Sequence, residues 1–105
     1  MAARTYGQSC SIATFLDALG GRWSLLLVRE LMLGPRKFSQ LLNGLQGIGP
    51  NLLSDRLSQF LELGIIQKQS ENVQKGSGHY ILTESGRGLE PILLDIVRWS
   101  LTHLP

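Results

Sequence analysis

Apolar residues recur at helical spacing along most of the chain, and glycine and proline mark the ends of the segments that they form. The first segment begins near residues 9–11, where serines can cap a helix, and ends at Gly20-Gly21. The second covers residues 22–33, is almost wholly apolar and is followed by Gly34-Pro35, a pair typical of a helix C-terminus. Because so few of its residues are polar, we expect this second helix to be central and buried.

Two more helices are predicted on either side of a short turn. Ser39 is the expected N-cap of a short helix over residues 40–45, and Gln46-Gly47 form the turn. Pro50 stands in the first turn of the next helix, which ends at Gly64. Two helices joined by a short glycine-containing turn match the helix-turn-helix outline, here over about residues 38–64.

A β-hairpin and a last helix complete the pattern. Residues 65–69 and 79–82 are predicted strands, joined by a long polar tip at residues 71–78, and together they form a wing over about residues 65–82. Thr83 can cap a single last helix over about residues 84–103. This order predicts a mainly α fold with a small β-hairpin, which is one winged helix-turn-helix domain over residues 1–105 with an extra helix at each end.

Composition narrows the class of protein. The chain has 105 residues, of which 43% are hydrophobic, and this suits one domain with a small core. The single cysteine cannot form an intramolecular disulfide, and the N-terminus lacks the apolar core of a signal peptide. No stretch has the roughly 18 consecutive apolar residues of a membrane span. We therefore expect a cytoplasmic protein that does not contact a membrane.

The small positive charge is concentrated in the middle of the chain. The formal net charge is +2, and residues 36–83 alone carry five basic and three acidic residues. A local basic surplus over the helix-turn-helix and the wing is a weak indication of nucleic-acid binding.

The helix predicted after Pro50 has a core face and a polar face. At about 100° per residue, its core stripe is made of Leu53, Leu57, Phe60 and Gly64. The opposite face holds Asn51, Asp55, Ser58 and Glu62, and the flanks hold Leu52, Ser54, Arg56 and Gln59. Side chains of these types pair with base edges or contact a thymine methyl, so the face suits a DNA major groove. The alternative is an ordinary solvated face, in which Arg56 pairs within the helix and Leu52 packs on a neighbouring helix.

The predicted wing carries hydrogen-bond donors as well. Lys68, Lys75, Ser77 and His79 lie on it, and Gly76 and Gly78 let its backbone approach a ligand closely. Such a ribbon can contact phosphates or enter a minor groove. A solvated loop with incidental lysines is the alternative.

Five pieces of sequence resemble, in their order and spacing, the HxlR-type winged helix-turn-helix regulators of bacteria, within the MarR-like superfamily. They are Cys10, GGRW at residues 20–23, GPRKF at 34–38, IGPNLLSDRL at 48–57 and YILTESGRGL at 80–89. The resemblance implies a homodimeric transcriptional regulator, in our interpretation a repressor, that binds an inverted-repeat operator in double-stranded DNA. The chain departs from the family where Ser11 replaces a common Pro and Gly49 replaces a frequent Ser cap.

The resemblance and the two faces described above together define the predicted DNA-contacting residues. They are Arg36, Lys37, Ser39, Gln40, Asn51, Leu52, Ser54, Asp55, Arg56, Gln59, Lys68, Lys75, Ser77 and His79. Leu52 and Asp55 stand where small polar or amide residues are common in the family, so the operator sequence of its relatives does not carry over.

The resemblance also implies a dimer interface on the first and last helices, and the last helix supports this independently. Its apolar residues, from Leu89 to Leu101, cover more of the circumference than one core face needs, so we expect the excess to meet a partner helix. The predicted interface residues are Phe15, Ile92, Ile96 and Trp99. A C-terminal helix wholly buried in its own subunit is the alternative.

Cys10 stands at the start of the first predicted helix, where free N–H groups favour a thiolate. Some members of the family sense oxidants or electrophiles through an N-terminal cysteine, which implies redox sensing here. Oxidation could give a mixed disulfide, a sulfenic acid or a bridge to Cys10 of the second subunit. A small packing residue without a sensing role is the alternative.

Other kinds of site find little support. His79 and His103 are too few for a metal site, and no nucleophile elbow, phosphate-binding loop or carboxylate pair is present, so we expect neither an enzyme nor a cofactor. Two functions besides DNA binding stay open. One is a protein-interaction module, because fold alone does not determine function. The other is a small-molecule sensor with an apolar pocket at the dimer interface near Phe15, Trp23 and Trp99, although these aromatic residues could simply pack in the core.

Overall fold

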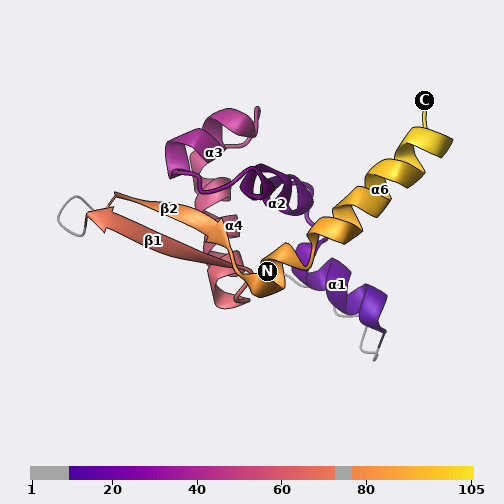
Figure 1. Cartoon of the computed structure of the whole chain (residues 1–105), viewed down its shortest axis with the longest axis horizontal. Helices are drawn as coiled ribbons and strands as arrows, with labels where there is room; N and C mark the ends of the chain where they lie inside the picture. Colours follow the sequence, from indigo (N-terminus) through magenta and orange to yellow (C-terminus); the bar gives the residue numbers. More distant parts are fainter. Residues whose placement is uncertain (1–9, 73–76) are drawn as a thin grey trace.

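The computed structural model describes residues 10–72 and 77–105 (Figure 1). In chain order its elements are α1 (Ser11–Leu19), α2 (Ser24–Met32), α3 (Phe38–Gly44), α4 (Pro50–Glu62), β1 (Ile66–Asn72), β2 (Ser77–Leu82), α5 (Glu84–Arg87) and α6 (Glu90–His103). Helices α2, α3 and α4 pack around one core, the hairpin extends from one side, and α1 and α6 lie on the other. The mainly α fold with a small β-hairpin is therefore confirmed.

Helix α2 is the central helix, as its composition predicted. Leu27 and Val28 are completely buried and Leu31 is nearly so. The helix begins at Ser24 rather than Arg22, because the Gly21 carbonyl accepts the Ser24 N–H in a turn that precedes it. Gly34 has a φ of +122° just after the helix, which is the left-handed conformation that glycine adopts readily.

The helix-turn-helix differs from its prediction in the cap of the first helix. Helix α3 begins at Phe38 with Lys37 as its N-cap, so Ser39 lies in the first turn and is not the cap. The Gln40 side-chain oxygen accepts the Lys37 backbone N–H at 2.8 Å. This bond satisfies one of the free N–H groups at the helix start, which makes a serine cap unnecessary.

The turn and the second helix follow the prediction closely. Gly47 has a φ of +98°, Ile48 is buried beneath the turn, and Pro50 opens α4. The helix ends where Gly64 takes a φ of +74°. The Ile65 N–H then bonds to the Phe60 carbonyl at 3.0 Å, so the chain turns directly from the helix into the wing.

The strands of the wing are longer than the predicted ones. Residues 71, 72, 77 and 78 were expected in the polar tip, but they belong to β1 and β2, and β1 also includes Ser70. Antiparallel pairing runs from Ile66–Leu82 to Asn72–Ser77, with an irregularity between Ser70 and Asn72. Backbone pairing can extend through polar residues, because it does not depend on the alternation of apolar and polar side chains. The strands predicted from that alternation were therefore too short.

The single last helix that was predicted is wrong: two helices, α5 and α6, replace it. Thr83 caps α5, since its Oγ1 accepts the Gly86 N–H at 3.2 Å. Pro91 has no N–H to offer to the Arg87 carbonyl, so one continuous helix cannot pass this point and α6 starts anew at Glu90.

Helix α6 projects from the body of the molecule and none of its residues is buried (Figure 1). The radius of gyration is 14.7 Å, compared with about 13 Å for a compact domain of 100 residues. A C-terminal helix wholly buried in its own subunit, the alternative considered above, is therefore wrong. Within the described residues no single helix is long and apolar enough to cross a membrane, and only the bent α1–α2 pair, at 78°, meets the length and composition criteria together.

Candidate nucleic-acid interface

Helix α4 presents a polar face to solvent and an apolar face to the core. Leu53, Leu57 and Phe60 are at most 2% exposed, which confirms these three residues of the predicted core stripe, whereas the fourth, Gly64, is exposed beyond the end of the helix. The opposite side of the helix is exposed and holds Asn51, Ser54, Asp55, Ser58 and Glu62. Its acidic residues lie away from the first turn, where Asn51 follows the helix N-terminus. That end offers free backbone N–H groups of the kind that bind phosphate.

Leu52 and Arg56, on the flank of α4, are both half-buried rather than exposed. Leu52 packs against the core cluster. Arg56 donates from Nη1 to the Gln59 side-chain oxygen at 3.2 Å. Its Nη2 lies only 3.2 Å from the point that a Cβ would occupy at Gly21. These contacts agree with the alternative in which Leu52 packs on its neighbours and Arg56 pairs within the helix.

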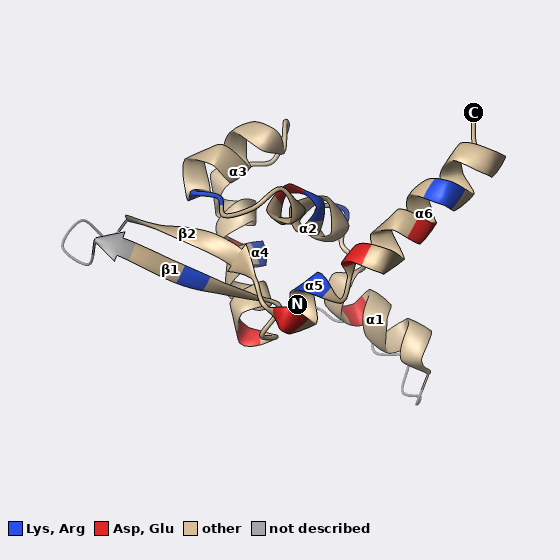
Figure 2. Ribbon diagram, in the orientation of Figure 1, with Lys and Arg blue, Asp and Glu red and all other residues tan. Residues whose placement is uncertain are grey.

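The segment that leads into α3 places basic residues beside the wing. The Arg36 backbone exchanges two hydrogen bonds with Tyr80, N–H to carbonyl at 3.1 Å and in return at 2.8 Å. Tyr80 also pairs with Lys68 across the hairpin. Arg36 thus lies alongside β2 in an isolated β-bridge. Figure 2 shows basic residues both at the start of α3 and on β1. The sequence pattern did not predict this bridge, because a bridge of one residue has no periodicity.

The polar side chains in this region differ in their exposure to solvent. Lys37, Ser39 and Gln40 are exposed, whereas Arg36 is half-buried and its Nη1 donates to the Pro35 carbonyl at 3.3 Å. Lys68 is exposed, and its Nζ lies 5.3 Å from the centre of the Tyr80 ring. His79 is half-buried. Lys75 and the side chain of Ser77 lie outside the described part of the wing.

Two further arginines, which the sequence analysis did not select, lie next to the helix-turn-helix. Arg22 and Arg29 line a cavity of about 400 Å³ between α2 and α3, together with Asn43 and Gln46. Arg22 lies over the Trp23 ring at 5.2 Å from its centre, and Arg29 pairs with Glu30 at 3.0 Å. The GGRW motif was the available signal for Arg22. Phe15 and Trp99 do not line this cavity, so it is distinct from the apolar pocket expected at the dimer interface, which stays a prediction.

The predicted redox and dimer residues lie at the other side of the molecule. Cys10 is exposed at the N-cap of α1. Phe15 is half-buried against the core. Ile92, Ile96 and Trp99 on α6 are 43%, 46% and 59% exposed. Ile12, Leu16, Leu94, Val97 and Leu101 are exposed apolar residues of the same two helices. The structure thus leaves a large apolar area uncovered in the single chain.

Within the described residues there is no group of three or more His, Cys, Asp or Glu side chains that could hold a metal ion.

Three helices, α2 to α4, of which the last presents an exposed polar face, followed by a β-hairpin, define a winged helix-turn-helix. The model of the HxlR-like helix-turn-helix family matches residues 18–105. The chain belongs to this family.

Named relatives support the assignment. The chain is 36% identical over 95 residues to the HTH-type transcriptional regulator MT3179 of Mycobacterium tuberculosis, covering 90% of this chain and 60% of that protein. Among solved structures, the transcription factor PA1607 has a TM-score of 0.82 and 32% identity, covering 94% of this chain and 68% of that one. The redox regulator HypR, in its reduced form, has a TM-score of 0.81 and 27% identity, covering 89% and 92%. The chain thus spans about three fifths of the length of the curated relatives that it matches first.

Proposed function

We propose that this protein is a transcriptional regulator that binds a specific sequence in double-stranded DNA. The observation that carries the proposal is the outer face of α4, where the polar side chains of Asn51, Ser54 and Asp55 are exposed and can form hydrogen bonds with base edges. The opposite face is fixed in the core by Leu53 and Phe60, so the helix can enter a groove without unfolding. Its HxlR-family membership supports the same function.

Each part of the interface has a separate role in this proposal. Asn51 pairs with adenine and Asp55 accepts from cytosine in the major groove. Lys37 and Lys68 contact phosphates on either side, because the bridge between Arg36 and Tyr80 holds their two segments together. Ser39 and Gln40 in the first turn of α3 lie close to the same phosphates, and Lys75, Ser77 and His79 extend the contact along the wing.

We further propose that the regulator is a homodimer held by α1 and α6. The exposed apolar residues of these helices are the surface that a second copy would cover. A two-fold dimer presents two copies of α4, which favours an inverted-repeat operator. Occupying an operator in this way blocks transcription, so we favour a repressor that acts in the bacterial cytoplasm.

Cys10 is the candidate switch in this proposal. It is exposed at the start of α1, next to the proposed dimer surface, so its oxidation or alkylation would alter the contact between the subunits. The structural similarity to HypR, which is described as a redox regulator, favours an oxidant or electrophile as the effector.

Selection of DNA fragments by the purified protein tests the main proposal. We expect one inverted-repeat sequence to be enriched, and its affinity to fall steeply between about 50 and 200 mM salt, because phosphate contacts release counterions. A Lys68→Ala variant is expected to reduce the salt dependence by about one phosphate contact while the preferred sequence stays the same. Arg98→Ala on α6 is the matched control, and it should leave both quantities unchanged.

The competing function, a protein-interaction module, predicts a different result. In that case no sequence is enriched, and the residual binding to DNA is the same for operator and scrambled fragments. Either result would overturn the proposal of sequence-specific binding.

A further inference from the structure

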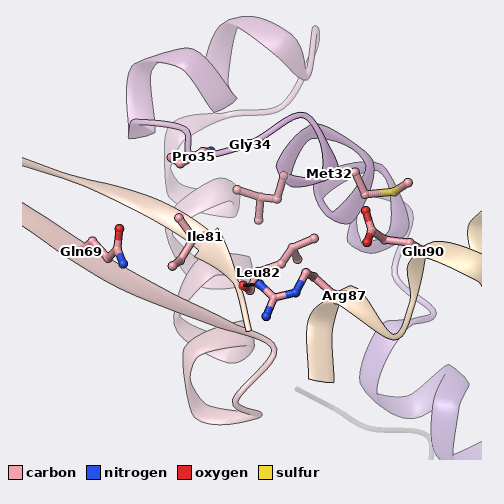
Figure 3. A pocket seen from close by; sticks show the side chains of 9 residues that line it. Met32, Gly34, Pro35, Gln69, Ile81, Leu82, Arg87 and Glu90 are labelled. Atoms are coloured by element: carbon pink, nitrogen blue, oxygen red, sulfur yellow. Dashed lines mark hydrogen bonds between the residues drawn. The ribbon is translucent and has the colours of Figure 1, made fainter. Parts of the chain in front are cut away.

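A cavity of about 310 Å³ lies where the wing, the end of α2 and the junction of α5 and α6 meet (Figure 3). Its walls are mostly apolar and include Met32, Pro35 and Ile81. Three polar side chains line it as well: Gln69 from β1, Arg87 from α5 and Glu90 from the start of α6. We call it the wing–helix cavity. Its volume lies at the lower end of the range for small-molecule sites, and a mostly apolar lining with a few polar groups is usual for such sites.

Arg87 and Glu90 are opposite charges that do not form an ion pair with each other. They are three residues apart, a spacing at which side chains on one helix meet. Here the chain passes from α5 to α6 between them, and the ion pairs found in the described residues are Arg29–Glu30 and Arg98–Asp95. Figure 3 shows the Glu90 carboxylate beside Met32 and the Arg87 guanidinium beside Leu82. The cavity therefore offers one positive and one negative group that are not paired with each other, together with apolar lining residues.

The Arg87 guanidinium is held in place from one side. Its Nη1 donates to the Leu82 carbonyl at 3.1 Å. A guanidinium has five N–H donors, so this bond orients the group and leaves donors for a carboxylate. Glu90 is half-buried, and a carboxylate in such a place gains from an ammonium partner.

We propose that the wing–helix cavity binds a small zwitterion with an apolar body, of which a free apolar amino acid is the simplest kind. The carboxylate of the ligand pairs with Arg87, its ammonium group pairs with Glu90, and its apolar body lies against Met32, Pro35 and Ile81. A ligand with only one of the two charges leaves the opposite group of the cavity without a partner, so it binds more weakly.

Binding there would have a consequence for regulation, and this part rests on the proposed function. The cavity joins β1 and β2 to the start of α6, so a ligand fixes the orientation of the wing relative to the proposed dimer helix. Because the wing and α4 contact the same DNA, a change in this orientation alters operator affinity.

Direct titration of the 105-residue chain tests the site without DNA. L-leucine and L-phenylalanine would be added while amide chemical shifts are followed by NMR, next to their deaminated acids isocaproate and hydrocinnamate and their decarboxylated amines isoamylamine and phenethylamine. We expect at least one amino acid to shift the amides of residues 31–34 and 81–90, and to bind about tenfold more tightly than its acid and its amine, because each charge contributes one charge-assisted hydrogen bond.

Two variants test which residue pairs with which charge of the ligand. Arg87→Gln is expected to abolish the preference for the amino acid over the amine, because the carboxylate loses its partner. Glu90→Gln is expected to abolish the preference for the amino acid over the acid, because the ammonium group loses its partner. Arg98→Gln and Asp95→Asn are the matched controls, because these two exposed residues of α6 pair with each other. Should Arg87→Gln fail to fold, Arg87→Lys keeps the positive charge and Glu90→Gln alone still tests the second pairing.

The proposal is overturned if no member of the panel shifts these amides, or if acid and amino acid bind equally well. These outcomes are independent of the proposed function. If the protein binds leucine but selects no DNA sequence, the ligand site is supported and the proposed function is overturned. If it selects an operator but binds no zwitterion, the proposed function is supported and the ligand site is overturned.

Discussion

A single side chain, Arg56, shows how far position on a helix determines what a residue does. By angle it stands on the flank of the exposed face of α4, where an arginine could contact a base or a phosphate. In the structure its guanidinium is turned toward Gly21 and bonded to Gln59. The absence of a side chain at Gly21 provides the space for this, so the role of Arg56 depends on a turn 35 positions away in the sequence. We infer that Arg56 positions α4 against the α1–α2 turn.

Substitution of Asn51 and Arg56 separates contact with DNA from positioning of the helix. Asn51→Ala is expected to weaken operator binding roughly 10- to 100-fold, equivalent to about 1–3 kcal/mol, and to leave the melting temperature unchanged because Asn51 is exposed. Arg56→Ala is expected to lower the stability by about 1 kcal/mol, through lost packing and a lost hydrogen bond, and to leave the salt dependence unchanged. Fluorescence anisotropy at several salt concentrations and thermal denaturation measure both. A salt slope reduced by about one unit in Arg56→Ala would show that Arg56 contacts a phosphate after all.

Two glycines with opposite surroundings give a test of packing. A Cβ at Gly86 would collide with the Ile65 carbonyl oxygen and lie 3.0 Å from Leu82, so Gly86→Ala is expected to destabilise the fold by about 1–3 kcal/mol. At Gly49 nothing lies within 4 Å, and φ is −82° at the N-cap of α4. Gly49→Ser is therefore expected to stabilise the fold by a few tenths of a kcal/mol. Urea denaturation compares the two, and equal effects would contradict the assigned environments.

Among the elements, α6 departs furthest from what an isolated domain requires. It has no buried residue, yet it is rich in large apolar side chains from Ile92 to Leu104. A helix of this composition is stable in water when a partner covers it, since most helical stability in proteins comes from tertiary packing of an apolar face. We therefore propose that α6 is covered in an assembly, with α1 and α6 of a second copy as the matching apolar surface.

A charge in the middle of this surface tests the assembly. Ile96→Asp is expected to shift the mass in solution from twice 11.6 kDa to 11.6 kDa at micromolar concentration, because a buried carboxylate without a partner opposes association. The monomer should retain its helical circular dichroism, since Ile96 contributes nothing to the core of its own subunit. Arg98→Ala, on the same helix, is the control. Light scattering coupled to size exclusion measures the mass, and a wild-type protein that elutes as a monomer would contradict the proposed dimer.

On the scale of the whole molecule, helices α1 and α6 and the proposed DNA-binding side are spatially separate (Figure 1). Cys10 and the apolar residues of α1 and α6 lie on one side of the core, while α3, α4 and the wing lie on the other (Figure 1). The principal dimensions of 45 × 34 × 27 Å reflect this division. In the proposed dimer, a signal received at Cys10 would therefore reach DNA through the arrangement of the two subunits rather than by direct contact.

This arrangement predicts the effect of oxidation. Diamide treatment is expected to lower the operator affinity of the wild-type dimer by at least about tenfold, by linking the two Cys10 thiols or by joining Cys10 to an added small thiol. Cys10→Ser should bind the operator like the untreated wild type and should not respond to diamide. Anisotropy before and after treatment, with the mass checked on a non-reducing gel, measures both. An unchanged response in Cys10→Ser would remove this residue from the mechanism.

Local patterns in the sequence predicted most of the elements and the orientation of α4. Periodicity identified the buried helix α2 and the core stripe at Leu53, Leu57 and Phe60, and glycines identified the turns. These features depend on residues a few positions apart, so a single sequence contains the information for them. The order of the predicted elements indicated the fold class, the family resemblance implied where DNA binds, and the family match confirmed membership of the family.

Contacts between distant residues decided the rest. The direction of Arg56, the bridge between Arg36 and Tyr80, and the wing–helix cavity each join segments that are far apart in the sequence. The exposure of α6 likewise depends on how much of the core the other helices already fill. The sequence by itself thus determined which elements form and which face of α4 is buried, because both follow from local periodicity. Only the tertiary structure decided which polar side chains remain free to bind, because that depends on the packing of residues that no local pattern connects.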